Sequence, residues 1–175
     1  MNYMDSYRHW LSMVSGDEKD ELLSIENDEK EIESRFYGGL EFGTAGLRGI
    51  MGAGTARMNI HVIRHATQAF AETILEDDES ENKSVAICYD CRVNSEKFAH
   101  AAAEVMAANG IHVKIFEAMR PTPELSFAVR HYKCSAGLNI TASHNPKEYN
   151  GYKVYWSDGA QIAPAKADII AAKMA

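Results

Sequence analysis

The sequence has no long hydrophobic run, and this absence limits where the protein can act. No apolar stretch approaches the roughly 20 residues that a membrane-spanning helix needs. Residues 1–5 lack the charged-then-apolar pattern of a secretory signal. Three cysteines, an odd number in a chain of 175 residues, do not suggest a disulfide framework. These absences together predict a cytoplasmic protein that does not act at a membrane.

The chain also lacks an excess of positive charge. It has 18 lysines and arginines against 25 acids, and its formal net charge is −7. Because nucleic acids and membrane surfaces are polyanions, we expect neither as a partner. Small phosphate ligands are still compatible, since they need only a local positive pocket. A hydrophobic content of 46% and a charged content of 25% are typical of a globular protein with a sizeable core.

No internal repeat or low-complexity tract is present, so the organisation follows from hydrophobic periodicity. Residues 1–37 predict an acidic helical arm, because apolar residues recur there at a spacing of three to four: Met4, Tyr7, Leu11 and Val14. Nine acids against three bases in residues 17–35 indicate a solvated helix face. We expect the arm to contribute packing and no chemistry.

Residues 38–175 predict an α/β domain. Seven glycines crowd into residues 38–57, which favours a structured loop or a pair of short strands. The elements that follow are a helix capped by Asn59, a strand at 85–89, a helix from Ser95 to about 109, a strand at 111–116, a helix capped by Thr122, strands at 136–140 and 151–156, and a helix at 165–174. This order predicts a three-layer α/β/α domain with a mostly parallel mixed sheet. The last helix has no convincing stop, so we expect a piece of a longer chain.

Polar side chains follow three of the predicted strands at their carboxyl ends. They are Asp90 and Arg92, Arg120 and Thr122, and Ser143 and His144. Ligands of open α/β sheets bind outside the carboxyl ends of parallel strands. The pattern therefore places a site at this edge of the sheet. Asp90 and Arg92 have an equally good structural explanation, namely an Asp–Arg contact that closes the end of the strand.

The strongest single pattern is Thr141-Ala142-Ser143-His144-Asn145-Pro146, which is followed by Asn150-Gly151-Tyr152-Lys153. The turn at Asn145-Pro146 places Ser143 at the end of a strand. A free serine hydroxyl is a weak nucleophile, and positive charge from Lys153 and Arg48 would stabilise a transferring phosphoryl group. Taken alone, Ser143 is more often a turn or capping serine and Lys153 an exposed strand lysine.

This loop resembles the phosphoserine loop of the α-D-phosphohexomutases, the family of phosphoglucomutases and phosphomannomutases. Every residue of the family pattern Thr-Ala-Ser-His-Asn-Pro, then Asn-Gly and a lysine, is present. Residues 41–49, Glu-Phe-Gly-Thr-Ala-Gly-Leu-Arg-Gly, resemble the family's Gly-Thr-x-Gly-x-Arg-Gly signature, and without Gly-Lys-Ser/Thr they are not a Walker loop. The two matches occur in the family's order.

The resemblance implies a role for each matching residue. Ser143 would be phosphorylated in the resting enzyme, and it would act as the catalytic residue together with Arg48 and Lys153. Thr44 and Arg48 would face the phosphoserine, and His144 and Lys153 would help to bind the phosphate. Lys153 would act as a general base or charge stabiliser, and a base near neutrality requires a lowered pKa. The implied reaction interconverts glucose 1-phosphate and glucose 6-phosphate through a sugar bisphosphate, with Mg²⁺ as cofactor and glucose 1,6-bisphosphate as activator.

The resemblance covers about residues 36–165 and leans toward the branch that includes phosphopentomutase-like enzymes. Complete members have four domains, and this chain is long enough for the first alone. The Asp-Gly-Asp loop that binds magnesium in the family's second domain is absent, because Asp158-Gly159 lacks the following Asp-x-Asp-Arg. Magnesium would receive one ligand here, an oxygen of phosphorylated Ser143, and the missing downstream domains would supply the others. We therefore expect the chain alone to be inactive as a mutase.

Three other functions remain open from the sequence. The chain could belong to a mutase of the same family that acts on pentose or mannose phosphates, because the sugar-reading loops lie outside it. It could be a non-catalytic phosphosugar-binding or regulatory module. It could also be a structural domain whose serine loop only binds anions.

The remaining cysteines and histidines predict no site of their own. Cys88-x-x-Cys91 has the spacing of a metal or redox site, but no second pair follows and Cys88 lies in an apolar strand. We interpret five of the histidines outside the serine loop as structural or surface residues: His61, His65, His100, His112 and His131.

Overall fold

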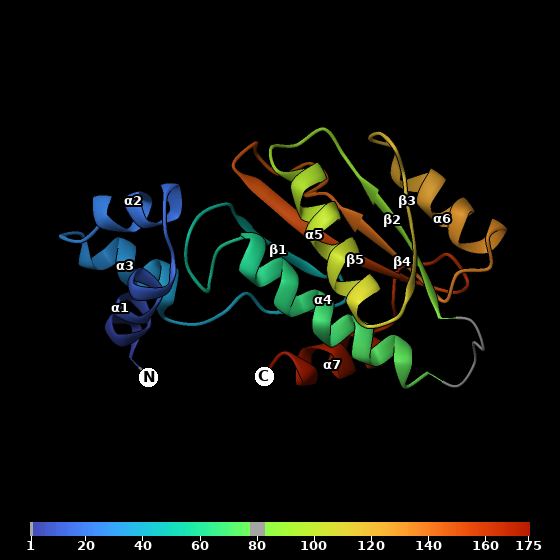
Figure 1. Ribbon diagram of the computed structural model, residues 1–175, viewed down its shortest axis with the longest axis horizontal. Helices are drawn as coiled ribbons and strands as arrows, with labels where there is room; N and C mark the ends of the chain where they lie inside the picture. The colour runs from blue at the N-terminus through green and yellow to red at the C-terminus, as the bar shows by residue number, and fades with distance from the viewer. Residues whose placement is uncertain (1, 78–82) are drawn as a thin grey trace.

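The computed structural model describes residues 2–77 and 83–175 (Figure 1). The arm holds three helices, α1 (Tyr3–Met13), α2 (Asp17–Ser24) and α3 (Glu29–Phe36). The body holds β1 (Leu47–Ile50), α4 (Ile60–Leu75), β2 (Ser84–Tyr89), α5 (Ser95–Ala108), β3 (His112–Ile115), α6 (Thr122–His131), β4 (Ala136–Ile140), β5 (Tyr149–Trp156) and α7 (Pro164–Lys173). In the described part of the chain, no helix combines the length and the apolar character needed to cross a membrane.

The five strands form one sheet in the order β1-β5-β4-β2-β3. Strands β2, β3 and β4 are parallel, whereas β5 pairs antiparallel with both β4 and β1. The predicted mostly parallel mixed sheet is therefore confirmed. Because β2, β3 and β4 run in one direction, their carboxyl ends meet at one edge, where the sequence predicts the site.

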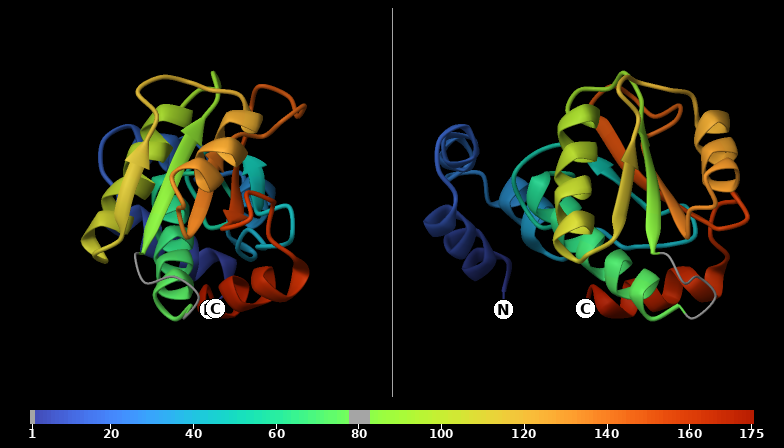
Figure 2. Two further views of the ribbon diagram at one scale, coloured as in Figure 1. Left: turned by 90° about the vertical axis from the view of Figure 1, so that its right-hand side faces the viewer. Right: turned by 45° about the vertical axis from the view of Figure 1, so that its right-hand side comes forward.

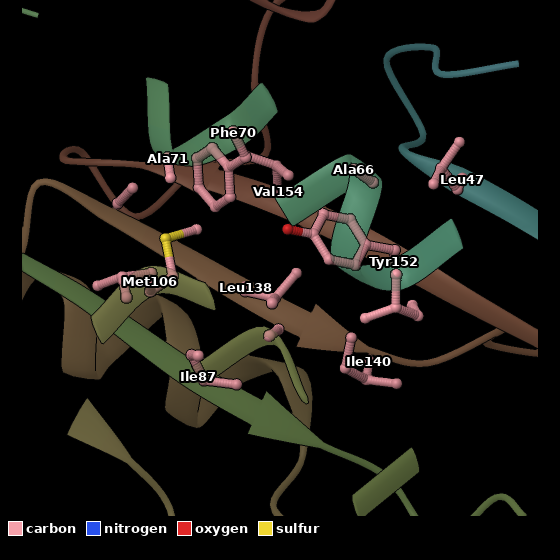
Figure 3. Packing of buried hydrophobic residues seen from close by; sticks show 14 of the residues in the cluster. Leu47, Ala66, Phe70, Ala71, Ile87, Met106, Leu138, Ile140, Tyr152 and Val154 are labelled. Carbon is pink, nitrogen blue, oxygen red and sulfur yellow. The ribbon is translucent and has the colours of Figure 1, made fainter. Parts of the chain in front are cut away.

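Helices cover both faces of the sheet, which gives the three layers that the sequence predicts (Figure 2). Helices α4, α5 and α7 pack on one face, where Leu138, Tyr152 and Val154 belong to the main apolar core. Figure 3 shows Tyr152 beside Ala66 of α4, and its hydroxyl donates to Thr67 Oγ1 at 3.0 Å. Side chains alternate along a strand, so the neighbours of Tyr152 in β5 point to the opposite face.

Helix α6 covers that opposite face. Its buried Leu125 and Val129 pack in a second apolar cluster that includes Cys88 of β2 and Tyr155 of β5. A Cβ at Gly137 would lie 2.6 Å from the Val129 side chain, so this glycine lets α6 lie close to β4. The Cys88 thiol donates to the Arg120 carbonyl oxygen at 3.0 Å, and burial raises its pKa to about 11.

The arm forms a small cluster of its own and is tied to the body by arginines. Its buried residues include Leu22, Ile32 and Phe36. Arg57 of the body donates to the Ser34 carbonyl oxygen at 3.0 Å and contacts Glu31 at 3.3 Å. The acidic face of the arm is therefore not wholly solvated, because part of it pairs with partly buried arginines.

One predicted cap is wrong. Helix α6 begins at Thr122, and its N-cap is the preceding Pro121, which has extended backbone. The Thr122 hydroxyl instead accepts a hydrogen bond from Asn139 Nδ2 at 2.8 Å. The sequence of residues 77–84, between α4 and β2, predicts a polar connection, and most of this segment, residues 78–82, lies outside the described residues.

Candidate active site

Ser143 lies in the turn directly after β4, with an exposed side chain. Its backbone has a φ of +57°, in the left-handed region that non-glycine residues adopt rarely. The Thr141 hydroxyl accepts a hydrogen bond from the Ser143 amide at 3.0 Å, and the Asn145 amide donates to the Ala142 carbonyl oxygen at 3.1 Å. The turn thus holds the serine hydroxyl outward at the carboxyl end of a buried strand.

His144 is the immediate neighbour of this hydroxyl. Its Nδ1 lies 3.4 Å from Ser143 Oγ, and the His144 side chain is exposed. Two buried acceptors without a hydrogen-bond partner among the described residues lie nearby in sequence, Asn139 Oδ1 and Asn145 Oδ1. Unsatisfied buried polar atoms are rare in folded proteins, so their position in and after β4 marks this edge as unusual.

Arg48 and Lys153 share one face of the sheet. Arg48 pairs with Gly151 across β1 and β5, and Lys153 is two residues further along β5. This face is opposite to the one that Tyr152 buries against α4. Partial burial lowers the pKa of Lys153, and the positive charge of Arg48 lowers it further, whereas Asp90 acts in the opposite direction. A lysine with a lowered pKa loses its proton more readily near neutrality.

Two glycines allow the chain to approach β5 closely at this place. Gly46, with a φ of +75°, lies so near β5 that a Cβ would be 1.9 Å from the Tyr152 carbonyl oxygen. A Cβ at Gly151 would be 2.5 Å from the Thr141 carbonyl oxygen. The glycine-rich segment and the serine loop therefore contact β5 at neighbouring positions, although they lie about a hundred residues apart in the sequence.

Thr44 takes a different position from the other predicted residues. It lies exposed in the turn between Gly43 and Gly46, and its carbonyl oxygen accepts a hydrogen bond from Gln161 at 2.9 Å. The structure thus brings Ser143 and His144 together and couples Lys153 to Arg48. Among the described residues, Thr44 makes its hydrogen bond with the segment that follows β5 and not with the serine loop.

Arg92 is the residue whose contacts the sequence does not reveal. Its guanidinium donates to carbonyl oxygens of the serine loop, including that of Ser143 at 2.9 Å. Its ion pair with Asp90, at 3.4 Å, matches the simple strand-closing explanation, but that explanation misses the loop contacts. The sequence signals for Arg92 are its place after β2, at the edge where the other polar residues gather, and the resemblance of Tyr89-Asp90-x-Arg92 to a family segment near the active site. Neither signal specifies the contacts with the serine loop.

The described residues do not by themselves suit a magnesium ion. No group of three or more acids, histidines or cysteines in the described part of the chain is placed to hold a metal. Asp90 already accepts hydrogen bonds from the Ser95 hydroxyl and the Arg92 amide. A magnesium ion prefers about six oxygens in octahedral order, and Ser143 supplies one oxygen at most through a phosphate.

The cysteines and histidines that we interpret as structural or surface residues make the following contacts. Cys88 is buried and Cys91 is exposed, and both are free. His61 contacts Glu18 of the arm at 3.1 Å, and His65 contacts the Met174 carbonyl oxygen at 2.9 Å.

Comparisons with known proteins place this arrangement in a family. The model of the phosphoglucomutase/phosphomannomutase alpha/beta/alpha domain I matches residues 39–175. A phosphoglucomutase of Staphylococcus haemolyticus is 45% identical over 130 residues, which cover 74% of this chain and 23% of that protein. A human phosphopentomutase is 43% identical over 147 residues, which cover 80% of this chain and 24% of that protein. The chain therefore belongs to the phosphoglucomutase/phosphomannomutase family and corresponds to its amino-terminal domain.

Solved structures agree with this assignment. A protein of Thermus thermophilus classed as a phosphomannomutase has a TM-score of 0.71 and 33% identity, over 79% of this chain and 30% of that protein. The phosphoglucomutase parafusin of Paramecium has a TM-score of 0.66 at 22% identity, over 79% of this chain and 26% of that protein, and it supports the fold alone. The chain spans about a quarter of the length of the curated relatives that it matches.

Proposed function

We propose that this chain is the phosphoryl-carrying domain of a phosphoglucomutase-like enzyme. The observation that carries the proposal is the position of Ser143, exposed in a left-handed turn at the carboxyl end of β4. Family membership supports an isomerase that moves a phosphoryl group on a sugar. In the proposed enzyme, glucose 1-phosphate and glucose 6-phosphate interconvert through glucose 1,6-bisphosphate, which also serves as the activator. From the composition, we propose that the enzyme is located in the cytoplasm.

In the proposed cycle, Ser143 donates and regains one phosphoryl group. The bond between phosphorus and Ser143 Oγ breaks as a sugar hydroxyl oxygen bonds to phosphorus, and the hydroxyl proton leaves through a base. The other phosphate of the resulting bisphosphate then returns to Ser143 by the reverse steps. The lowered pKa of Lys153 supports its role in accepting the proton.

Positive charge at the site would stabilise the transferring group. Arg48 offers a planar fork of donors to phosphate oxygens, and the strand register supports the proposal because Arg48 and Lys153 lie on the same face of the sheet. His144, 3.4 Å from Ser143 Oγ, would help to hold the phosphate. Thr44 would face the phosphoserine with its side chain, because the hydrogen bond from Gln161 uses only its backbone carbonyl oxygen.

Magnesium enters the proposal only as a partner of the phosphorylated serine. The described residues do not complete its coordination, so we propose that the remaining ligands come from further domains of a longer chain, in line with a match that covers 23% of the staphylococcal relative. When bound, magnesium would neutralise charge on the phosphate. We accordingly propose that this chain alone does not turn over sugar phosphates.

The test is an isomerisation assay on the longest natural chain that contains this sequence. The assay compares three substrates: glucose 1-phosphate, ribose 1-phosphate and mannose 1-phosphate. Each reaction also contains glucose 1,6-bisphosphate and Mg²⁺. We expect the highest kcat/KM with glucose 1-phosphate and a loss of at least about 10³-fold in Ser143→Ala, because the covalent carrier is removed. Activity that Ser143→Ala leaves unchanged would overturn the proposal.

A pentose phosphate is the second candidate substrate, and one observation favours it. The human relative at 43% identity is a phosphopentomutase, whereas the relative at 45% is a phosphoglucomutase. In the same assay a preference for ribose 1-phosphate would support this alternative. No turnover of any sugar, with phosphosugar binding retained, would support the non-catalytic binding module.

A further inference from the structure

The guanidinium of Arg92 lies at the centre of the loop that carries Ser143. Nη2 donates to the carbonyl oxygens of Ser143 and Asn145 at 2.9 and 2.6 Å. Nη1 donates to those of Pro146 and Tyr149 at 2.8 and 3.1 Å. The Arg92 side chain is only 13% exposed. One planar cation thus binds four backbone oxygens of residues 143–149.

Asp90 fixes the orientation of this guanidinium. Its Oδ2 lies 3.4 Å from Arg92 Nε, and its Oδ1 accepts from the Arg92 amide at 3.0 Å. The same Oδ1 accepts from the Ser95 hydroxyl at 2.7 Å, at the start of α5. Asn150 Nδ2 donates to Ser95 Oγ at 3.0 Å, so the far end of the loop is joined to the same network.

These contacts reduce the negative charge that the loop itself places near the serine hydroxyl. Carbonyl oxygens carry partial negative charge, and a phosphorylated serine adds a charge of about −1.5 to −2 at neutral pH. The four oxygens that accept hydrogen bonds from Arg92 share its positive charge, so they repel the phosphate less. The left-handed conformation of Ser143 is sterically unfavourable for a residue with a Cβ, and the bond from Nη2 to its carbonyl oxygen helps to hold it.

We propose that Arg92 is a positioning residue, which holds residues 143–149 in the conformation that presents Ser143 Oγ for phosphoryl transfer. Its donors are committed to the loop and to Asp90, so it acts through the backbone and not on the phosphate. This inference rests on the proposed function of Ser143. A lysine cannot replace Arg92, because an ammonium lacks the planar fork that reaches four separate oxygens.

The experiment compares Arg92→Ala and Arg92→Lys with Arg64→Ala in the longest natural chain that contains this sequence. Arg64 is a suitable control, since it pairs with Glu104 on the surface and has a half-exposed side chain. The first readout is the rate at which Ser143 gains phosphate from glucose 1,6-bisphosphate, with and without low millimolar guanidinium or methylammonium chloride. The second is hydrogen–deuterium exchange of the peptide over residues 141–150, without sugar.

We expect both Arg92 variants to take up phosphate roughly 100-fold more slowly, the size of effect that a misplacement of about 1 Å produces. Guanidinium should restore part of the rate in Arg92→Ala, and methylammonium should not. Exchange in residues 141–150 should rise in both Arg92 variants and stay unchanged in Arg64→Ala. A rate equal to that of Arg64→Ala would overturn the inference, as would a slow rate with unchanged exchange and no guanidinium rescue.

The two readouts separate this inference from the proposed function. If the unmodified chain never takes up phosphate, the carrier role of Ser143 fails. In that case the hydrogen–deuterium exchange measurement by itself still tests whether Arg92 holds the loop. Faster exchange in Arg92→Ala supports its hold on the loop, and unchanged exchange contradicts it.

Discussion

Lys153 is a residue whose pKa depends on its surroundings. Its pKa is lowered first by partial burial and then by Arg48, so removal of the Arg48 charge should raise it. We expect Arg48→Gln to shift the Lys153 pKa upward, which a ¹³C NMR titration of the lysine Cε resonances would show. If Lys153 accepts a proton in transfer, the pH–rate profile should move to higher pH in this variant. The same Lys153 pKa in Arg48→Gln and in Arg64→Gln would contradict the coupling.

Gly46 is a residue for which the structure leaves no room for a side chain. Its φ is +75°, and a Cβ would lie 1.9 Å from the Tyr152 carbonyl oxygen. We expect Gly46→Ala to lower the free energy of unfolding by about 2 kcal/mol or more, through backbone strain and displacement of β5. Gly38→Ala is the matched control, because no atom lies within 4 Å of its added Cβ. Equal stabilities in urea unfolding would show that the glycine-rich segment and β5 do not approach so closely.

The position of the serine loop was predictable from local pattern, whereas contacts across the fold were not. A strand that ends in a proline turn predicts where Ser143 and His144 lie, and only the family resemblance implies a site role for them and for Arg48 and Lys153. The four carbonyl oxygens that Arg92 binds belong to residues 51 to 57 positions further along the chain. No local signal specifies such contacts, because they arise when β2 and β4 pair in parallel.

The arm is the element whose attachment makes the clearest prediction. Arg57 donates to the carbonyl and hydroxyl oxygens of Ser34 and contacts Glu31, with its side chain only 11% exposed. Loss of such charge-assisted bonds should cost about 1.5–3 kcal/mol, so Arg57→Met should speed hydrogen exchange in α1–α3 roughly tenfold or more. Exchange in β2 and β4 should stay unchanged. Equally slow hydrogen exchange of the arm in Arg57→Met and in Arg64→Met would show that these bonds do not hold the arm to the body.

Element types followed from periodicity, whereas some element ends did not. Strands β2 and β4 are buried along their whole length, so their apolar runs were clear signals. The predicted N-cap of α6, Thr122, lies one residue after the observed N-cap, Pro121. The sequence does not separate them, because Pro121, Thr122 and Pro123 are all compatible with a helix start. The structure uses Thr122 to bind Asn139 of β4, a contact between elements that sequence spacing does not reveal.

At the scale of the whole molecule, the chain presents an exposed serine at the carboxyl end of β4, with Arg48 on β1 and Lys153 on β5, and its described residues hold no group placed to bind a metal. The chain spans about a quarter of the length of its curated relatives, so the division of the site between domains stays a proposal. The fold was predictable from hydrophobic periodicity, and the family from two short motifs. The sugar that is recognised was not, since the motifs concern the phosphoryl group alone.

The most direct test of the central claim is tandem mass spectrometry of the peptide that contains Ser143. The longest natural chain containing this sequence is measured as purified, then after incubation with glucose 1-phosphate, and again after glucose 1,6-bisphosphate. We predict a phosphate on Ser143 that the monophosphate removes and the bisphosphate restores. A Ser143 that stays unmodified through both treatments would contradict the carrier role.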